Sequence, residues 1–90
     1  MSAEEFDAQI KFLDQIVKRK RIIKALYPNN QIQQSELAEI TSISKGNLSK
    51  YLNDLEYNGV IIISADTNTR GQPVKKIELT QKTRQIIKLK

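Results

Sequence analysis

The feature that most constrains the fold is the long uninterrupted start of the chain. No Gly or Pro occurs in residues 1–27, and Pro28 then opens a Pro-Asn-Asn sequence typical of a helix end. Ser2 and Glu5 have the spacing of a capping box, in which two side chains satisfy free backbone N–H groups. The sequence therefore predicts one long helix over residues 1–27.

Apolar residues lie along two sides of this predicted helix. At about 100° per residue, one stripe consists of Phe6, Ile10, Leu13 and Val17, and the roughly opposite stripe consists of Phe12, Ile16, Ile22, Ile23 and Leu26. If the second stripe packs on the core, the first stays in water unless another chain covers it. We therefore expect the first stripe to form a homodimer interface, which would also stabilise a small domain. The alternative is a break near Lys18 that gives two internally packed helices.

Charge is spread unevenly along the chain. Lys and Arg number 15 against 10 Asp and Glu, for a net charge of +5 and a pI of about 9.6. Residues 1–17 carry one base and four acids, whereas residues 18–24 carry five bases and residues 61–90 carry seven bases and two acids. This local excess of positive charge favours an anionic partner. Some of the run Lys18–Arg21 is expected to contact flanking phosphates, with a nuclear-import signal as the alternative that composition allows.

Several classes of protein are excluded by what the composition lacks. The chain has no Cys and no His, so disulfides, cysteine-ligated zinc and the usual metal-sensing ligands are absent, and we expect no metal and no cofactor. No carboxylate pair is placed against a nucleophile, so we expect no enzyme activity. The acidic start has no signal-peptide pattern, and no apolar run approaches the roughly 18 residues of a membrane span. We therefore expect a cytoplasmic protein with no membrane partner.

Two short helices are predicted after the Pro-Asn-Asn turn. Residues 31–33 are long enough for a brief strand, and Ser35 is expected to cap a helix of about two turns whose apolar side contains Leu37, Ala38 and Ile40. Residues 41–43 then form a tight turn, with Ile43 filling the gap between the two helices. Ser44 is expected to cap a second helix that runs to Asn58 and is closed by Gly59. This pattern is typical of a helix-turn-helix.

The outward face of the second helix is rich in hydrogen-bond donors. Its buried stripe consists of Leu48, Leu52 and Leu55, with Tyr51 at the margin, and its opposite face consists of Gly46, Lys50, Asn53 and Tyr57, flanked by Asn47 and Ser49. No acid occurs in this helix before Asp54. Donors gathered at a positively polarised helix N-terminus suit a polyanion such as DNA. Taken singly, each residue could also be an ordinary solvated position.

A hairpin and a last helix complete the chain. The predicted strands are residues 60–64 and 74–79, joined by a polar loop, 66–73, with Arg70 near its tip. Arg on a projecting loop can pair with phosphate or enter a minor groove; the alternative is a solvated turn shaped by Gly71. Thr80 is expected to cap a helix from Gln81 to about Lys88. The apolar side of that helix, Ile86 and Ile87, is expected to pack on the first helix.

Four segments carry a resemblance to a known family: SELAEIT at 35–41, SKGNLSKYL at 44–52, LEYNGVI at 55–61, and RGQPV at 70–74 followed by Leu79 and Thr80. From about Lys20 to Thr83 the chain resembles winged helix-turn-helix proteins, nearest to the MarR, ArsR and PadR groups of prokaryotic, archaeal and viral regulators. The resemblance implies a mainly α fold with a small β-hairpin, in the order α-β-α-α-β-β-α, with a long N-terminal helix. We expect one domain, residues 1–90: a dimerisation extension (1–18), a DNA-binding core (19–80) and a C-terminal helix (81–90).

The resemblance also implies a function. Helix 44–58 would face the major groove through Ser44, Lys45, Gly46, Asn47, Ser49, Lys50 and Asn53, and the wing 65–73 would contribute Arg70 and Gln72. The expected protein is a homodimeric, nucleoid-associated transcriptional regulator, a repressor, that reads an inverted repeat in double-stranded DNA. Alternatives are a plasmid or viral partition or replication adaptor and a winged-helix protein-interaction module. Thr83 replaces a Gly usual in the family, and the chain lacks the length for an effector-binding body, so no small-molecule effector is expected.

Overall fold

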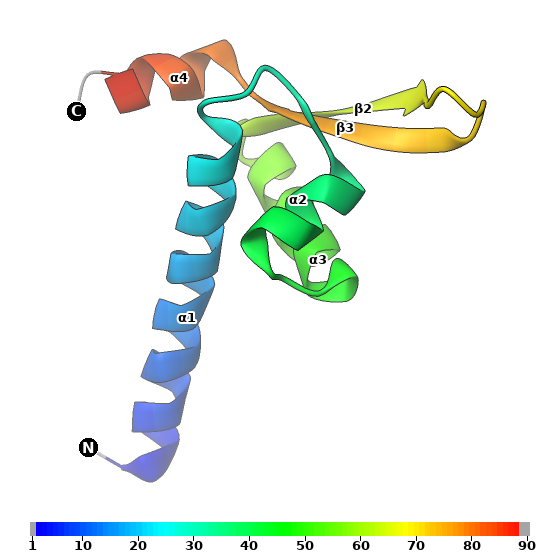
Figure 1. Cartoon of the computed structure of the whole chain (residues 1–90). Coiled ribbons are helices and arrows are strands. Elements are labelled where there is room, and N and C mark those ends of the chain that lie inside the picture. The colour runs from blue at the N-terminus through cyan, green and yellow to red at the C-terminus, as the bar shows by residue number, and fades with distance from the viewer. Residues whose placement is uncertain (1, 89–90) are drawn as a thin grey trace.

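The structure is a computed structural model that describes residues 2–88. Its elements follow one another as α1 (Ala3–Leu26), β1 (Ile32–Gln33), α2 (Gln34–Thr41), α3 (Lys45–Tyr57), β2 (Ile61–Thr67), β3 (Pro73–Leu79) and α4 (Gln81–Lys88) (Figure 1). The predicted fold class is confirmed: four helices accompany a small antiparallel sheet whose strand order is β1-β3-β2. None of the helices described within these residues is both long and apolar enough to cross a membrane.

Helix α1 is one continuous helix, so the alternative of a break near Lys18 is wrong. The Ser2 hydroxyl accepts a hydrogen bond from the Glu5 backbone N–H at 3.2 Å, and the Glu5 carboxylate accepts one from Ser2, which confirms the capping box. The N-terminal half of α1 projects past the rest of the molecule (Figure 1). The radius of gyration is 14.8 Å, whereas a compact chain of this length would have about 12 Å.

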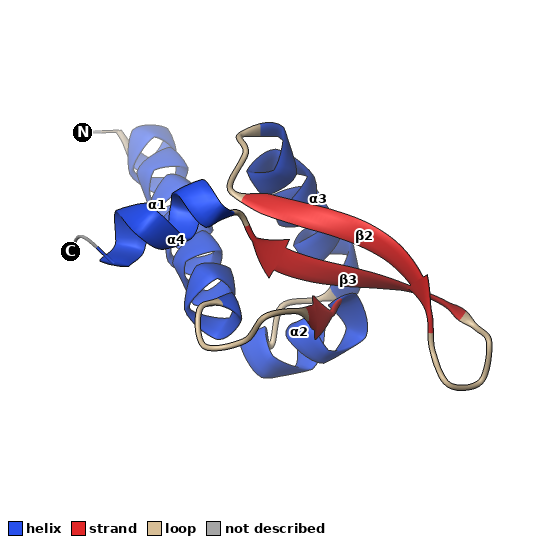
Figure 2. Ribbon diagram, turned by 90° about the horizontal axis from the view of Figure 1, so that it is seen from above, coloured by secondary structure: helices blue, strands red, loops and turns tan. Residues whose placement is uncertain are grey.

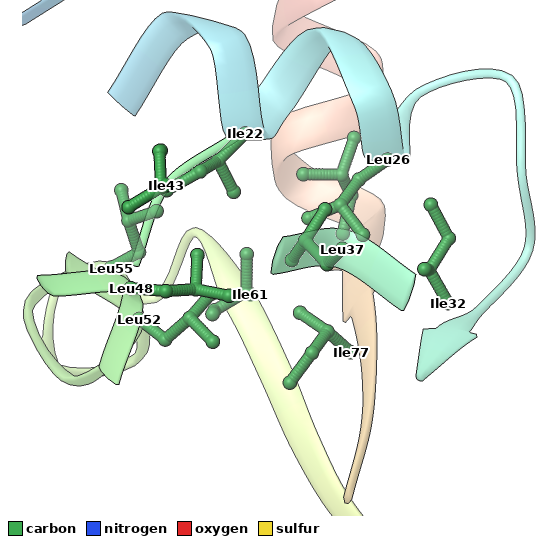
Figure 3. Packing of buried hydrophobic residues seen from close by; sticks show 11 residues of the cluster. Ile22, Leu26, Ile32, Leu37, Ile43, Leu48, Leu52, Leu55, Ile61 and Ile77 are labelled. Carbon is green, nitrogen blue, oxygen red and sulfur yellow. The ribbon is translucent and has the colours of Figure 1, made fainter. Parts of the chain in front are cut away.

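The core lies where the C-terminal half of α1, the two short helices and the sheet meet (Figure 3). Its buried apolar side chains are Ile22, Leu26, Ile32, Leu37, Ile43, Leu48, Leu52, Leu55, Ile61, Ile77 and Leu79. The predicted inner stripe of α1 is therefore only partly correct. Ile22 and Leu26 are buried, but Phe12 is 61% exposed, because the buried core takes in only the last turns of α1.

The turn between α2 and α3 is tight because Ser42 adopts a left-handed conformation, with a φ of 58°. Ile43 follows it and is buried between the helices, as predicted. The predicted cap of α2 is wrong: the helix begins at Gln34, its N-cap is Gln33, and Ser35 lies within the first turn. The short strand β1 runs directly into α2, so no residue is left between them for a separate cap.

Helix α3 ends in a Schellman motif, as the position of Gly59 predicted. The N–H of Gly59 donates to the Glu56 carbonyl at 3.0 Å, and the N–H of Val60 donates to the Leu55 carbonyl at 2.9 Å. Gly59 has a φ of +73°, a backbone conformation that residues with a Cβ rarely adopt. This motif turns the chain from α3 straight into β2.

The hairpin is longer than predicted, because both of its strands extend closer to the loop. Strands β2 and β3 pair from Ile61 opposite Leu79 to Thr67 opposite Pro73, leaving only residues 68–72 as the loop. The backbone pairing continues at Asp66 and Thr67, whose polar side chains do not give the apolar pattern by which a strand is predicted. The hairpin therefore projects as a stiff ribbon, away from α1 in both views (Figures 1 and 2).

The last helix is capped as predicted, since the Thr83 N–H donates to the Thr80 hydroxyl at 3.3 Å. Helix α4 lies across the C-terminal end of α1 (Figures 1 and 2), where the Arg84 guanidinium donates to the backbone carbonyls of Tyr27 and Asn29. Of its two predicted apolar contacts, Ile87 packs against the core, whereas Ile86 is 51% exposed. Helix α4 is thus held against the core by Ile87 and against the turn that follows α1 by Arg84.

Candidate nucleic-acid interface

The outward face of α3 is displayed as the sequence predicted. The Ser44 hydroxyl caps the helix by accepting a hydrogen bond from the Asn47 N–H at 3.4 Å. The exposed residues of this segment are Ser44, Lys45, Gly46, Asn47, Lys50 and Asn53. Its first turn contains no acid, so the positive end of the helix dipole is not neutralised there. The face can therefore donate hydrogen bonds and accept a negatively charged partner.

Ser49 differs from the other residues predicted for this face. It is only partly exposed, and its hydroxyl accepts a hydrogen bond from the Gln34 side-chain amide at 3.1 Å. This bond joins the start of α2 to the second turn of α3. Ser49 therefore fixes the two helices relative to each other in addition to lying beside the outward face.

The acid-free face ends at Asp54, whose carboxylate is paired with α1. The Arg19 guanidinium lies 2.5 Å from Asp54 Oδ2, and its Cζ atom lies 5.7 Å from the centroid of the Tyr51 ring. Both partners of Arg19 lie on one side of α3, because they are three residues apart. Arg19 thus neutralises the acid nearest to the outward face and connects α1 to α3.

A cleft separates the projecting half of α1 from α3. It has a volume of about 450 Å³, and its lining residues are Lys11, Asp14, Gln15, Arg19, Asn47, Lys50, Tyr51 and Asp54. Asn47 and Lys50 therefore border α1 on one side and open solvent on the other. Lys11 and Gln15 were not predicted as site residues, because their proximity to α3 depends on the angle between two helices distant in sequence.

The Lys18 ammonium forms an ion pair within its own helix. It lies 3.0 Å from the Asp14 carboxylate, one turn earlier. The hydrogen bond and the charge of Asp14 raise the pKa of Lys18 above its usual value. Lys18 therefore remains positively charged at neutral pH.

The tip of the hairpin is an ordered turn built around one side chain. The Asn68 side-chain oxygen accepts hydrogen bonds from the backbone N–H groups of Arg70 and Gln72, each at 2.9 Å. Gly71 supplies the left-handed φ of +77° that the turn requires. Arg70 and Gln72 are both exposed at this tip, although the Gln72 side chain also accepts a hydrogen bond from the Asn68 amide at 3.2 Å. Arg70 is thereby presented on a defined loop.

An ion pair supports the outer half of the hairpin. The Lys76 ammonium lies 2.9 Å from the Asp66 carboxylate on the neighbouring strand. The hydrogen bond from Lys76, together with one from the Thr67 N–H, holds the pKa of Asp66 below its usual value. Asp66 is consequently ionised at neutral pH and already paired, so it adds no free negative charge beside the wing.

The residues predicted for the dimer interface all lie exposed on the projecting part of α1. Phe6 is 54% exposed and Leu13 is 59% exposed, and Ile10 and Val17 are exposed to a similar extent.

One further large side chain is exposed on α3, where Tyr57 is 90% exposed at the end of the outward face. Tyr57 belonged to that face by helical periodicity but has no charge or amide that marked it as a binding residue.

Comparison with known proteins agrees with this arrangement. A transcriptional regulator homologue from Pyrococcus horikoshii OT3 has a TM-score of 0.70 at 24% identity, covering 79% of this chain and 69% of that one. A MarR family transcriptional regulator from Silicibacter pomeroyi DSS-3 has a TM-score of 0.67 at 19% identity, covering 97% and 64%. A ZitR variant from Lactococcus lactis has a TM-score of 0.65 at 22% identity, covering 99% and 70%. These likenesses show the fold.

Sequence comparison identifies the family. No curated protein matches the chain. Residues 17–62, just over half of the chain, match the family described as winged helix-turn-helix DNA-binding. This match spans the end of α1, both helices of the helix-turn-helix and the start of β2, which are the elements that position the exposed face of α3. The chain therefore belongs to the winged helix-turn-helix DNA-binding family.

Proposed function

We propose that the protein is a homodimeric transcriptional regulator, acting as a repressor, that binds an inverted repeat in double-stranded DNA. The observation that carries the proposal is the exposed, acid-free outward face of α3 in a chain of a DNA-binding family. Solved structures with the same fold are described as transcriptional regulators, which supports this role over other uses of DNA binding.

In the proposed complex the N-terminal half of α3 enters the major groove. Ser44, Lys45, Gly46 and Asn47 lie at the start of the helix, where backbone N–H groups and short side chains suit phosphate contacts. Lys50 and Asn53 lie one and two turns further along the exposed face, where they can reach base edges. Lys can donate to guanine acceptors, and Asn can pair with adenine in a bidentate manner. Sequence preference would therefore depend most on Lys50 and Asn53.

The wing would make a second contact with the same DNA. Arg70 lies at the tip of a hairpin that extends beyond the helices (Figure 1), and Gln72 follows it on the same turn. An Arg at such a tip can pair with phosphate or enter a narrow minor groove. This contact would add affinity with little dependence on the base sequence.

Replacing a residue that reads base edges should weaken binding to the preferred site. We expect Lys50→Ala and Asn53→Ala each to cost about 1–3 kcal/mol of binding free energy at the cognate sequence and to relax the preference at the bases they contact. Binding is measured by fluorescence anisotropy with cognate and scrambled duplexes. Lys82→Ala, an exposed Lys on α4, is the matched control and should leave affinity nearly unchanged. Equal losses for Lys50 and Lys82 would contradict the proposed interface.

Replacing the wing Arg should have a different signature. We expect Arg70→Ala to weaken binding by a similar factor on cognate and scrambled duplexes, because a phosphate contact carries no base information. The slope of log K against log salt should become shallower by about one unit, since one fewer counterion is released. An unchanged salt slope would place Arg70 outside the complex.

The proposed function as a whole is tested by selecting bound fragments from a random pool of duplex DNA at physiological salt. A palindromic consensus would support a dimer with sequence-specific binding. Fragments with no common sequence would overturn sequence-specific regulation, and recovery of no DNA would overturn DNA binding itself. A reporter gene placed behind the selected site would then distinguish repression from activation, because a repressor lowers its expression.

A further inference from the structure

The exposed apolar residues of α1 are spaced as in a coiled coil. Phe6, Ile10, Leu13 and Val17 follow one another at intervals of four, three and four residues, the spacing that lets two helices pack along a narrow seam. We call these four residues the α1 seam. Each is about half exposed in a single chain, so the seam is available to a partner.

The α1 seam faces away from the rest of the domain. At about 100° per residue, the buried Ile22 and Leu26 each lie about 160° around the helix from Phe6. The core packs on that buried side of α1. A second helix can therefore pack along the seam without displacing the core or covering the outward face of α3.

We propose that two copies of the chain pair along the α1 seam as antiparallel helices, with Ile10 facing the partner's Leu13 and Phe6 facing the partner's Val17. In this register every seam residue meets another apolar residue. The proposal rests on the homodimer of the proposed function and specifies the geometry of its interface.

The charge pattern of α1 favours the antiparallel direction. Its N-terminal end carries Glu4, Glu5 and Asp7, whereas five bases lie between residues 18 and 24. Parallel helices would place these basic runs side by side, with Lys20 and Lys24 of each chain on the seam side. In the antiparallel register the basic runs lie at opposite ends of the helix pair, and Lys20 of each chain lies opposite residue 3 of its partner, next to Glu4 and Glu5. Opposite charges beside an interface favour one orientation over the other.

The antiparallel register also separates the two domains. Its midpoint falls between residues 11 and 12, so the two copies of Ile22 are 21 residues apart along the helix pair. At 1.5 Å per residue this separation is about 32 Å along the axis. The two domains then lie at opposite ends of the helix pair, and each keeps its own cleft and its own α3 face open.

Cross-linking between cysteine variants tests this geometry, because the natural chain contains no Cys. Ile10→Cys and Leu13→Cys chains carrying tags of different mass are mixed and oxidised, and the products are separated without reductant. A disulfide needs Cα atoms about 4.4–6.8 Å apart, so we expect the mixed Ile10→Cys with Leu13→Cys product to exceed both like-with-like products. A second mixture, Phe6→Cys with Val17→Cys, should behave in the same way. Phe12→Cys, which lies off the seam, should cross-link poorly with every variant.

Other products would overturn the proposal in identifiable ways. A dominant Ile10→Cys like-with-like product would indicate parallel helices, and a dominant Leu13→Cys with Val17→Cys product would indicate an antiparallel pair in another register. If the wild type sediments as a monomer, the proposed pairing is wrong. Mixed cross-links in a protein that binds no DNA would leave the pairing intact and overturn the proposed function, so the two failures are distinguishable.

Discussion

Leu37→Ala is expected to lower the free energy of unfolding by about 2–5 kcal/mol, because it removes a fully buried side chain and leaves a cavity. Leu37 is 0% exposed and lies at the centre of the core, on α2, the helix that precedes α3 (Figure 3). Small domains have only about 5–15 kcal/mol of stability in total. The variant should therefore unfold at a much lower urea concentration than the wild type.

Ile40→Ala provides the matched control for this prediction. It removes an aliphatic side chain of the same size from the same helix, but Ile40 is 58% exposed. Surface substitutions usually change stability by no more than about 0.5 kcal/mol. Urea denaturation followed by circular dichroism gives both values at one protein concentration. Similar losses for the two variants would mean that Ile40 is covered in the assembled protein or that α2 packs differently.

Much of the fold could be predicted because strong local signals agree with the final packing. The capping box at Ser2, the N-cap at Ser44 and the Schellman position of Gly59 each satisfy backbone groups within a few residues. Such contacts depend little on the rest of the molecule. Periodicity likewise identified Leu48 and Leu52 as buried, because α3 has a single apolar side.

The errors occur where distant parts of the chain decide the outcome. Ser35 was expected to cap α2, but pairing of Gln33 opposite Lys76 brings the strand to the edge of the helix. Phe12 continues the inner stripe of α1 by periodicity, yet the core ends before it. Residues 65–67, Ala-Asp-Thr, belong to β2 because β3 pairs with them. No local pattern in the sequence contains this information.

The candidate site shows the same difference between features set by local sequence and features set by distant contacts. The exposure of Lys50 and Asn53 followed from their position opposite the leucine stripe of one helix. The pairing of Arg19 with Asp54 joins residues 35 apart and depends on how α1 crosses α3. In the sequence the basic run 18–21 is one group of charges, whereas the structure gives three of its four members separate partners: Asp14 for Lys18, Asp54 for Arg19 and the Thr41 carbonyl for Arg21.

Leu13→Glu is expected to convert the proposed dimer into a monomer, because it places a charge at the centre of the α1 seam. The largest expected effect of Leu13→Glu is on the affinity of the protein for a full inverted repeat. Two linked half-site contacts bind more tightly than one by about 10²–10⁴-fold, since the second contact forms within the same complex. We expect the variant to lose that factor on a full inverted repeat and to retain its affinity for a single half-site.

Phe12→Glu separates loss of the seam from loss of an exposed apolar side chain. Phe12 is 61% exposed, close to the 59% of Leu13, and lies one residue away on a different side of the same helix. Sedimentation at matched concentrations should give a dimer for Phe12→Glu and a monomer for Leu13→Glu, and only the latter should lose affinity for the full repeat. If both variants dissociate, the interface must extend around the helix beyond the seam. If only Phe12→Glu dissociates, the dimer uses the other side of α1, because a charge is tolerated wherever the side chain stays in water.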